Sequence, residues 1–314
     1  MKIQRIQQVI IMLFLGLIIS KPIHSQVGTF TTNPTPSPYE CGLSQSVMAT
    51  LANDTAFVNG FTRYNNEVNN NANKLLTPAP YIVPVVFHVI STTSVTSVLP
   101  YAQIQWQMAR LNAAFANSMN LFTGQPNGPQ AVNTHIEFRL ACVAKNCNLG
   151  WSNNAEPGVM RYASSDPLVL NQGVAPNPAT TIPMLAITHP TNCPSTFPTS
   201  EYLNIWCVPN IGSAAAYGTF PWLNVGIDGI VSRIDIIGNN SYPTGLGGLM
   251  PSLDKGSVLA HEAGYYLGLF HTFETVLSSN VNTAGGLLNC YGTTGTSALT
   301  DGDMVYDTPP TLIN

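Results

Sequence analysis

The segment HEAGYYLGLFH, from His261 to His271, is the most informative stretch of this sequence. It fills all but one of the fixed positions of a long zinc-binding motif, H-E-x-x-H-x-x-G-x-x-H. In that motif two histidines on one helix face bind the metal, and a glycine then lets the chain leave the helix sharply. The last histidine approaches the metal from outside the helix, and the glutamate lies beside the metal-bound water. His261, Glu262, Gly268 and His271 occupy their expected positions.

Tyr265 stands where the motif has its second histidine. A phenol oxygen lies further from Cβ than an imidazole Nε2 and, with a pKa near ~10, must lose a proton to bind a metal well. Three interpretations follow. Tyr265 is an oxygen ligand to a shifted metal, or another histidine serves as the ligand in its place. In the third, zinc binding is weak or lost and the chain is a pseudo-enzyme. The histidines available for the second interpretation are His88, His135 and His189. His88 and His135 lie in or beside predicted strands, so we expect them to be structural.

The composition describes a folded protein with few charges. Hydrophobic residues make up 45% of the 314 residues, which is enough for a sizeable core and excludes wholesale disorder. Charged residues make up only 8%, and the net charge is −4. A chain without excess positive charge is not attracted to phosphate backbones, so we expect no nucleic-acid partner.

The N-terminus is typical of an export signal. Lys2 and Arg5 precede an apolar run at residues 9–19, and Ser25 and Gln26 flank a suitable cleavage point. The run is shorter than the ~20 residues that a membrane-spanning helix needs. We therefore expect residues 1–25 to be a signal peptide, the chain to be secreted, and no membrane association after signal cleavage. Six cysteines fit the oxidising environment of an exported protein, and none forms a C-x-x-C pair: Cys41, Cys142, Cys147, Cys193, Cys207 and Cys290.

The sequence after the signal divides near residue 80. Residues 26–79 are rich in threonine, proline and asparagine, which predicts a pro-segment or linker before a domain at residues 80–314. Within that domain, β-branched apolar runs predict strands, and helical spacing of apolar residues predicts two main helices, so the fold class is α+β with a mixed sheet. The strands are expected at 81–91, 136–143, 202–208 and 229–237, and the helices at 101–119 and 258–270. Pro84 predicts an edge or a bulge in the first strand.

Further segments carry a resemblance that covers most of residues 80–310. They are VPVVFHVI at 83–90, AQIQWQMARLNAAF at 102–115, YLNIWCV at 202–208, AYGTFP at 216–221, DGIV at 228–231 and GDMVYDTPP at 302–310. Together with the histidine motif, they resemble the pappalysin/cytophagalysin family of metzincin zinc metallopeptidases. The resemblance implies a metzincin-like mixed twisted sheet with a backing helix and an active-site helix. It also implies a methionine-containing turn below the metal, and since the only methionine after His271 is Met304, we expect this C-terminal subdomain to be truncated.

The resemblance assigns roles to the motif residues. His261 and His271 would be zinc ligands, Tyr265 would replace the second ligand, and Glu262 would act as general base and acid. The implied function is a secreted zinc metalloendopeptidase, impaired in this chain, whose substrate is an extended polypeptide lying along the edge strand. The alternative is a non-catalytic pseudo-peptidase that serves as a peptide- or protein-binding module, and a third interpretation is a purely structural remnant.

The resemblance also points to two accessory sites. Asp301, Asp303 and Asp307 cluster in the DTP loop, where oxygen ligands suit calcium, and a solvated turn is the alternative. Cys41 lies in the sequence Glu-Cys-Gly, which resembles the pro-segment motif whose thiolate caps zinc in latent members of the clan. A disulfide at Cys41 is the alternative.

Overall fold

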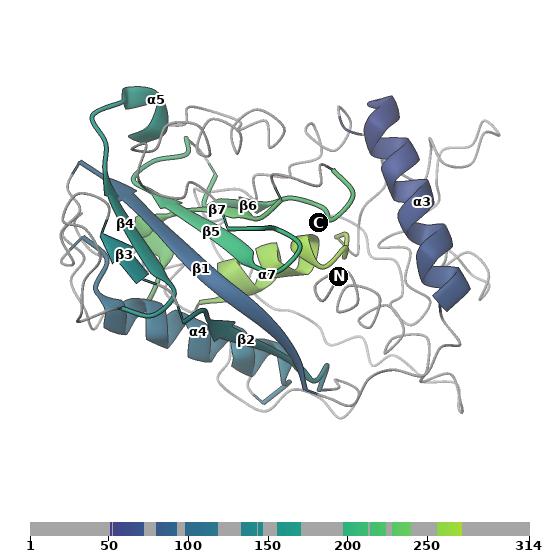
Figure 1. Ribbon diagram of the computed structural model, residues 1–314, viewed down its shortest axis with the longest axis horizontal. Helices are drawn as coiled ribbons and strands as arrows, with labels where there is room; N and C mark the ends of the chain where they lie inside the picture. Colours follow the sequence, from purple (N-terminus) through teal and green to yellow (C-terminus); the bar gives the residue numbers. More distant parts are fainter. Residues whose placement is uncertain are drawn as a thin grey trace, which may run out of the picture.

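The computed structural model describes the core of the predicted domain and one helix that precedes it (Figure 1). A mixed sheet carries two main helices, so the predicted α+β class is confirmed. None of the helices in this described part of the chain is long and apolar enough to cross a membrane. The described residues are 51, 53–71, 80–92, 98–118, 133–142, 144–146, 156–170, 197–212, 214–223, 228–239 and 256–271.

The strands form one sheet of mixed direction. They are β1 (Tyr81–Ser91), β2 (Ile136–Leu140), β3 (Ala144–Asn146), β4 (Val159–Ala163), β5 (Leu203–Val208), β6 (Ala216–Gly218) and β7 (Ile230–Arg233). Their order is β3-β4-β1-β5-β7-β6, and β2 pairs with the first part of β1. The pairs are parallel except for β6 with β7, which is antiparallel. The short edge strand β6 therefore gives the sheet its mixed character.

The central strand β1 has buried side chains on both faces. Such a strand reads as a nearly continuous apolar run because both faces of a largely parallel sheet are covered. Pro84 lies opposite Arg139 of β2, and β5 joins β1 only from Val85 onward. At Pro84, β1 therefore has only one neighbouring strand among the described residues. Proline has no N–H to donate to a second strand, so it fits this position although β1 as a whole is central.

Several elements end earlier than the sequence pattern predicts. Helix α4 (Tyr101–Phe115) stops before Asn117, whose φ is +53°, and α7 (Ser257–Tyr266) stops before Gly268. The predicted strand at 229–237 is β7 followed by a short 3₁₀ helix, η1 (Ile234–Ile236). The short helix α5 (Pro167–Leu170) is one turn long. The spacing of apolar residues extends beyond these ends in the sequence, so it predicted longer elements. The helices end where the backbone turns, near Asn117 and Gly268.

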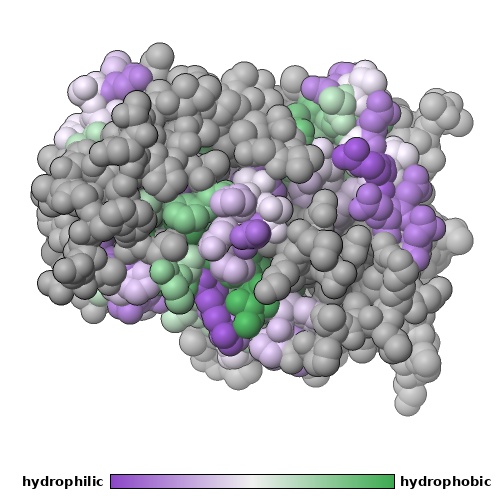
Figure 2. Space-filling model, viewed as in Figure 1, coloured by the Kyte–Doolittle hydropathy of each residue, from purple (hydrophilic) through white to green (hydrophobic). Residues whose placement is uncertain are grey.

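A helix also forms inside the segment that the sequence predicts as a pro-segment or linker. This helix, α3 (Thr55–Asn71), begins after Asp54, whose carboxylate accepts hydrogen bonds from the N–H groups of Ala56 and Phe57 at 2.7 and 3.2 Å. Such an N-cap satisfies donors that the first turn would otherwise leave free. Its outward side is hydrophilic (Figure 2), and its inward side carries buried aromatic residues.

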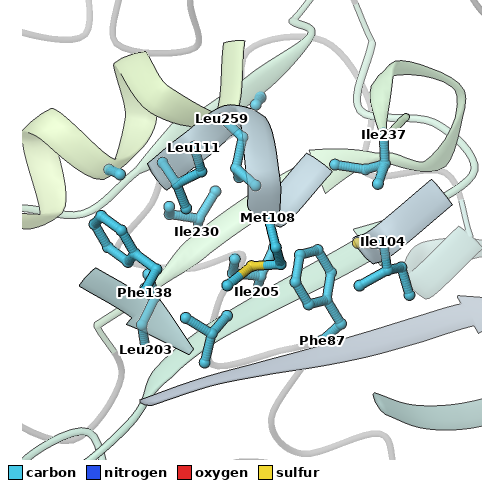
Figure 3. Packing of buried hydrophobic residues seen from close by; sticks show 14 of the residues in the cluster. Phe87, Ile104, Met108, Leu111, Phe138, Leu203, Ile205, Ile230, Ile237 and Leu259 are labelled. Atoms are coloured by element: carbon cyan, nitrogen blue, oxygen red, sulfur yellow. The ribbon is translucent and has the colours of Figure 1, made fainter. Parts of the chain in front are cut away.

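The main core lies between the sheet and the helices α4 and α7. Side chains from α4 and α7 interlock with those of β1, β5 and β7 in one buried cluster (Figure 3). Alternate residues of β1 point to this cluster, and the others point to a second apolar cluster on the opposite face. Labelled members of the main cluster are Phe87, Ile104, Met108, Leu111, Phe138, Leu203, Ile205, Ile230, Ile237 and Leu259.

Two buried glutamines of α4 fix the chain that leads into α7. The amide of Gln107 donates to the carbonyl of Gly256 at 3.0 Å and accepts the N–H of Gly238 at 3.3 Å. Gln103 exchanges two hydrogen bonds with the backbone of Asn239, at 2.9 and 2.7 Å. Gly256 is the N-cap residue of α7. The backing helix therefore sets where the helix with the histidine motif begins.

We expect Gln107→Leu to lower the free energy of unfolding by about 2 kcal/mol, because a buried N–H and a buried carbonyl lose their partner. Urea unfolding followed by circular dichroism measures the change. The matched control is Gln105→Leu, which alters an exposed position on the same helix and should change stability by less than about 0.5 kcal/mol. Equal effects of the two substitutions would contradict the assigned role of Gln107.

Candidate active site

Helix α7 lies directly on the edge strand of the sheet. A Cβ added to Gly218 of β6 would lie 2.5 Å from the carbonyl oxygen of Glu262, so helix and strand are in backbone contact. Gly256 starts the helix with a φ of +76°, and Gly268, with a φ of +94°, turns the chain after its end. Left-handed backbone of this kind favours glycine. The segment is thus fixed at its start, its middle and its end.

His261 and Tyr265 of α7 converge with His271, which follows the turn at the end of this helix. The ring centroids of the two histidines are 5.1 Å apart. The Tyr265 ring lies 4.9 Å from the His261 ring and 5.2 Å from the His271 ring, nearly perpendicular to both. The meeting of the two imidazoles, which the spacing of the motif predicts, is observed. We refer to these three side chains as the His–Tyr–His cluster.

The hydroxyl of Tyr265 lies within hydrogen-bonding distance of both imidazoles. It is 3.1 Å from Nε2 of His261 and makes a very short contact with Nε2 of His271. A phenol can donate one hydrogen bond and also accept one. With one imidazole protonated at Nε2 and the other at Nδ1, the hydroxyl accepts from the first and donates to the second. This assignment of tautomers is inferred from the hydrogen-bonding partners.

Both histidines of the cluster favour the neutral form. Burial lowers the pKa of His261, although the residue keeps some contact with solvent. Burial, together with the nearby positive charge that His261 would carry, lowers the pKa of His271 to about 4. A neutral imidazole keeps one ring nitrogen free to accept a hydrogen bond, which the scheme requires of the imidazole to which Tyr265 donates.

The cluster does not match the zinc site of the motif. A metal shared by the two histidines would lie about 2.0–2.1 Å from each Nε2, in the space between the nitrogens where the Tyr265 hydroxyl lies. A neutral phenol must also lose a proton before it binds a metal well. No group of three or more His, Cys, Asp or Glu side chains suited to a metal occurs in the described part of the chain. The ligand roles of His261, Tyr265 and His271 stay a prediction.

Glu262 is the remaining member of the motif. It follows His261 on α7, and the residue is 1% exposed, in contrast to its exposed neighbour. Its backbone carbonyl faces Gly218 of the edge strand. The predicted role of its carboxylate as general base and acid is not tested by this placement, because that role needs an activated water.

Of the other candidate site residues, the structure describes His88 and His135, and His88 has its hydrogen-bond partners elsewhere in the sheet. Both ring nitrogens of His88 are engaged elsewhere, Nδ1 with the hydroxyl of Tyr162 at 2.6 Å and Nε2 with Oδ1 of Asn204 at 2.9 Å. The expectation that His88 is structural is confirmed, and it is not available as a third ligand. His135 is exposed just before β2, with a φ of +57°. His189, Cys41, Asp301, Asp303 and Asp307 lie outside the described residues, so the calcium and latency-thiol predictions stay untested.

The cysteines provide no disulfide in the part of the chain that is described. Cys142 is exposed, Cys207 is buried, and both are free. The other four cysteines lie outside the described residues. Disulfide pairing, which the oxidising environment of an exported protein would favour, therefore stays a prediction.

Sequence reasoning missed the aromatic residues that surround Tyr265. Tyr265 is 3% exposed and packs edge-on against Phe220, with ring centroids 5.4 Å apart. Phe220 stacks on Trp222 at 4.8 Å. Neither residue belongs to the histidine motif, and nothing in the spacing of AYGTFPW marks them as neighbours of Tyr265. Only the long-range packing of β6 on α7 brings them there.

A buried carboxyl group lies near Tyr266 of α7. Asp228, two residues before β7, is 8% exposed, and its Oδ1 has no hydrogen-bond partner among the residues placed by the structure. Burial raises its pKa from 3.8 to about 7, and the hydrogen bond with Thr199 opposes part of that shift. Its charge adds to the burial that raises the pKa of Tyr266, the residue after Tyr265.

We expect Asp228→Asn to remove a pH-dependent loss of stability. The unfolded carboxyl ionises near pH 4, whereas the folded one keeps its proton to about pH 7, so the folded state of the original chain loses stability as the pH rises from about 4 to 7. Above pH 7 the loss is constant, at up to about 4 kcal/mol. Urea unfolding of both chains at pH 4, 6 and 8 checks this. A stability difference between them that does not grow over this range would contradict the prediction.

Comparison with known proteins relates the chain to secreted peptidases. No family model matches the sequence. An extracellular metalloprotease of Arthroderma otae is 25% identical over 224 residues, which are 71% of this chain and 57% of that relative. One from Arthroderma benhamiae is 31% identical over 110 residues, or 35% of this chain and 30% of the relative. The chain is thus a distant relative of extracellular metalloproteases and spans less than two thirds of their length.

Solved structures support the fold. A promirolysin mutant from Tannerella forsythia superposes with a TM-score of 0.53 at 23% identity, covering 74% of this chain and 68% of that chain. Mature mirolysin of the same organism, in complex with a cleaved peptide, gives a TM-score of 0.48 at 24% identity and covers 76% and 82%. The promirolysin superposition confirms the predicted metzincin-like α+β fold.

Proposed function

We propose that this chain is a secreted, polypeptide-binding protein derived from zinc metalloendopeptidases, in which Tyr265 impairs hydrolysis. The observation that carries the proposal is the Tyr265 hydroxyl, which hydrogen-bonds to the two imidazoles that the motif reserves for zinc. The similarity to extracellular metalloproteases supports the ancestry and the export. The quoted motifs favour the pappalysin/cytophagalysin group within that ancestry.

Impaired hydrolysis would follow from the hydrogen bonds of Tyr265, which engage the two Nε2 atoms that a catalytic zinc would need. In peptidases of this kind zinc polarises the scissile carbonyl and lowers the pKa of its bound water to about 7. Glu262 can accept a proton from such a water, but a buried carboxylate without it has no activated nucleophile to serve. We therefore assign Glu262 no step in this chain as it stands.

Polypeptide binding is the part of the ancestral function that needs no metal. The edge strand β6 lies beside α7, and an extended chain can add to such an edge through backbone hydrogen bonds. All three residues of β6 are buried. A polypeptide that extends the sheet there must first displace what covers the strand, so we expect slow association with unfolded polypeptides.

Metal content and peptide hydrolysis of the secreted chain test the proposal together. Recombinant protein is incubated with zinc sulfate, desalted and analysed by mass spectrometry, and is then mixed with reduced, alkylated casein. We expect zinc well below one ion per chain, no cleavage and measurable binding to immobilised casein. Stoichiometric zinc with cleavage that disappears in Glu262→Ala would overturn the impaired state, and lack of binding would overturn the binding role.

A further inference from the structure

Helix α3 presents a row of aromatic side chains to the region of the His–Tyr–His cluster. Phe57, Phe61 and Tyr64 are four and three residues apart, which places them on one helix face. Ring centroids of Phe57 and Phe61 lie 5.8 and 5.1 Å from that of Trp222, and the Tyr64 ring lies 4.9 Å from it. Phe61 also packs edge-on against Phe270 at 5.4 Å. Phe57 and Phe61 are buried.

The backbone of α3 lies very close to the backbone at Trp222. A Cβ added to Gly60 would lie 2.7 Å from the carbonyl oxygen of Trp222, so only glycine fits there. A Cβ on Gly268 would lie 2.6 Å from the Tyr64 hydroxyl. That hydroxyl donates to the carbonyl of Leu267 at 3.3 Å. Burial and the charge of Glu67 raise the pKa of Tyr64, so it remains a donor at any physiological pH.

These contacts connect α3 to two members of the cluster. Phe57 packs edge-on against Phe220 at 5.8 Å, and Phe220 in turn packs against Tyr265. Phe61 packs against Phe270, the residue before His271. The helix therefore supports the Tyr265 side through one aromatic contact and the His271 side through another.

We propose that α3 is a permanent wall of the His–Tyr–His cluster and remains bound after the chain is cut between α3 and β1. The folded unit then includes α3 and does not begin near residue 80, and α3 acts as a positioning element for Tyr265 and His271. Its loss would uncover Phe220, Trp222 and Phe270, which are all buried now, and would create a contiguous apolar surface. α3 would have this role whether or not the cluster binds zinc.

The test cuts the chain after it has folded. A recognition sequence for a specific protease is placed between Asn71 and Tyr81, and the purified full-length protein is cleaved and passed over a gel-filtration column. We expect the two fragments to elute together and to separate only in denaturant. Separation on the column, with the larger fragment keeping its circular dichroism and its melting temperature, would overturn the proposal.

Substitutions distinguish a wall of the cluster from a merely attached helix. In the cut protein, Phe61→Ala should weaken fragment binding about a hundredfold, as expected for removing a buried aromatic side chain. Arg63→Ala, at an exposed position of the same helix, should change it less than about twofold. In the uncut chain, Phe61→Ala should shift the imidazole NMR signals of His271, whereas Arg63→Ala should not. Unchanged His271 signals in Phe61→Ala would contradict the positioning role.

Discussion

Tyr265→His is expected to convert the His–Tyr–His cluster into a zinc site, with a gain in zinc affinity on the order of a thousandfold. The substitution removes the hydroxyl from between the two Nε2 atoms and supplies a third imidazole from the same helix face. The two existing imidazoles already favour the neutral, metal-binding form, since the pKa of His271 is about 4 and that of His261 is lowered. Zinc therefore need not displace protons from them at neutral pH.

Competition with a chromogenic chelator measures the affinity of each chain for zinc. The matched control is Tyr265→Phe, which removes the same hydroxyl but adds no ligand and should bind zinc no better than the original chain. If Tyr265→His also restores hydrolysis of casein, the additional substitution Glu262→Ala should abolish it. Equal zinc affinities of Tyr265→His and Tyr265→Phe would show that an imidazole at the second histidine position of the motif does not join the other two in binding the metal.

The site illustrates which contacts a sequence can predict. The meeting of His261 and His271 follows from local rules, namely helical spacing and the sharp turn at Gly268, so the motif alone predicts it. The greater reach of a phenol was also foreseeable, and the structure shows where that reach ends: the Tyr265 oxygen lies within hydrogen-bonding distance of both Nε2 atoms. Its partnership with both imidazoles was not predicted, because it depends on how two rings from different segments are oriented.

The surroundings of the site lay beyond sequence reasoning for a different reason. The asparagine-rich end of α3 reads as a linker, and its aromatic spacing shows an amphipathic helix without naming its partner. Its contacts with Trp222 and Phe270 join segments that are distant in the sequence. The raised pKa of Asp228 likewise arises from burial that only tertiary packing creates. Local patterns thus predicted β1, β2, β5, β7 and the helices α4 and α7, but not β3, β4 or α3, and the walls of the site depend on long-range contacts.

Gly218→Ala is expected to lower the free energy of unfolding by about 3 kcal/mol, the upper part of the range for overpacking. The new Cβ would lie 2.5 Å from the carbonyl oxygen of Glu262 and 3.3 Å from Cβ of Tyr265. The first of these atoms belongs to a helix backbone, which cannot rotate away as a flexible side chain would. The helix must therefore move off the edge strand, and urea unfolding followed by circular dichroism measures the cost.

The matched control is Gly264→Ala, on α7 itself. A Cβ there would meet only Leu269, at 3.8 Å, which is ordinary van der Waals contact. Replacing a mid-helix glycine with alanine should stabilise the chain by about 0.5–1 kcal/mol. The two substitutions add the same methyl group in the same region, so their opposite signs would isolate the contact between strand and helix.

The consequence for the site is larger than the stability change alone suggests. Because His261 and Tyr265 are carried by α7, any movement of that helix away from Gly218 changes their distance to His271, which lies beyond the turn and packs through Phe270 against α3. The hydrogen bonds of Tyr265 should then weaken, and the imidazole NMR signals of His271 should shift in Gly218→Ala but not in Gly264→Ala. If stability fell while those signals stayed unchanged, the cluster would be held by its own hydrogen bonds and by α3, and the edge strand would not be what positions it.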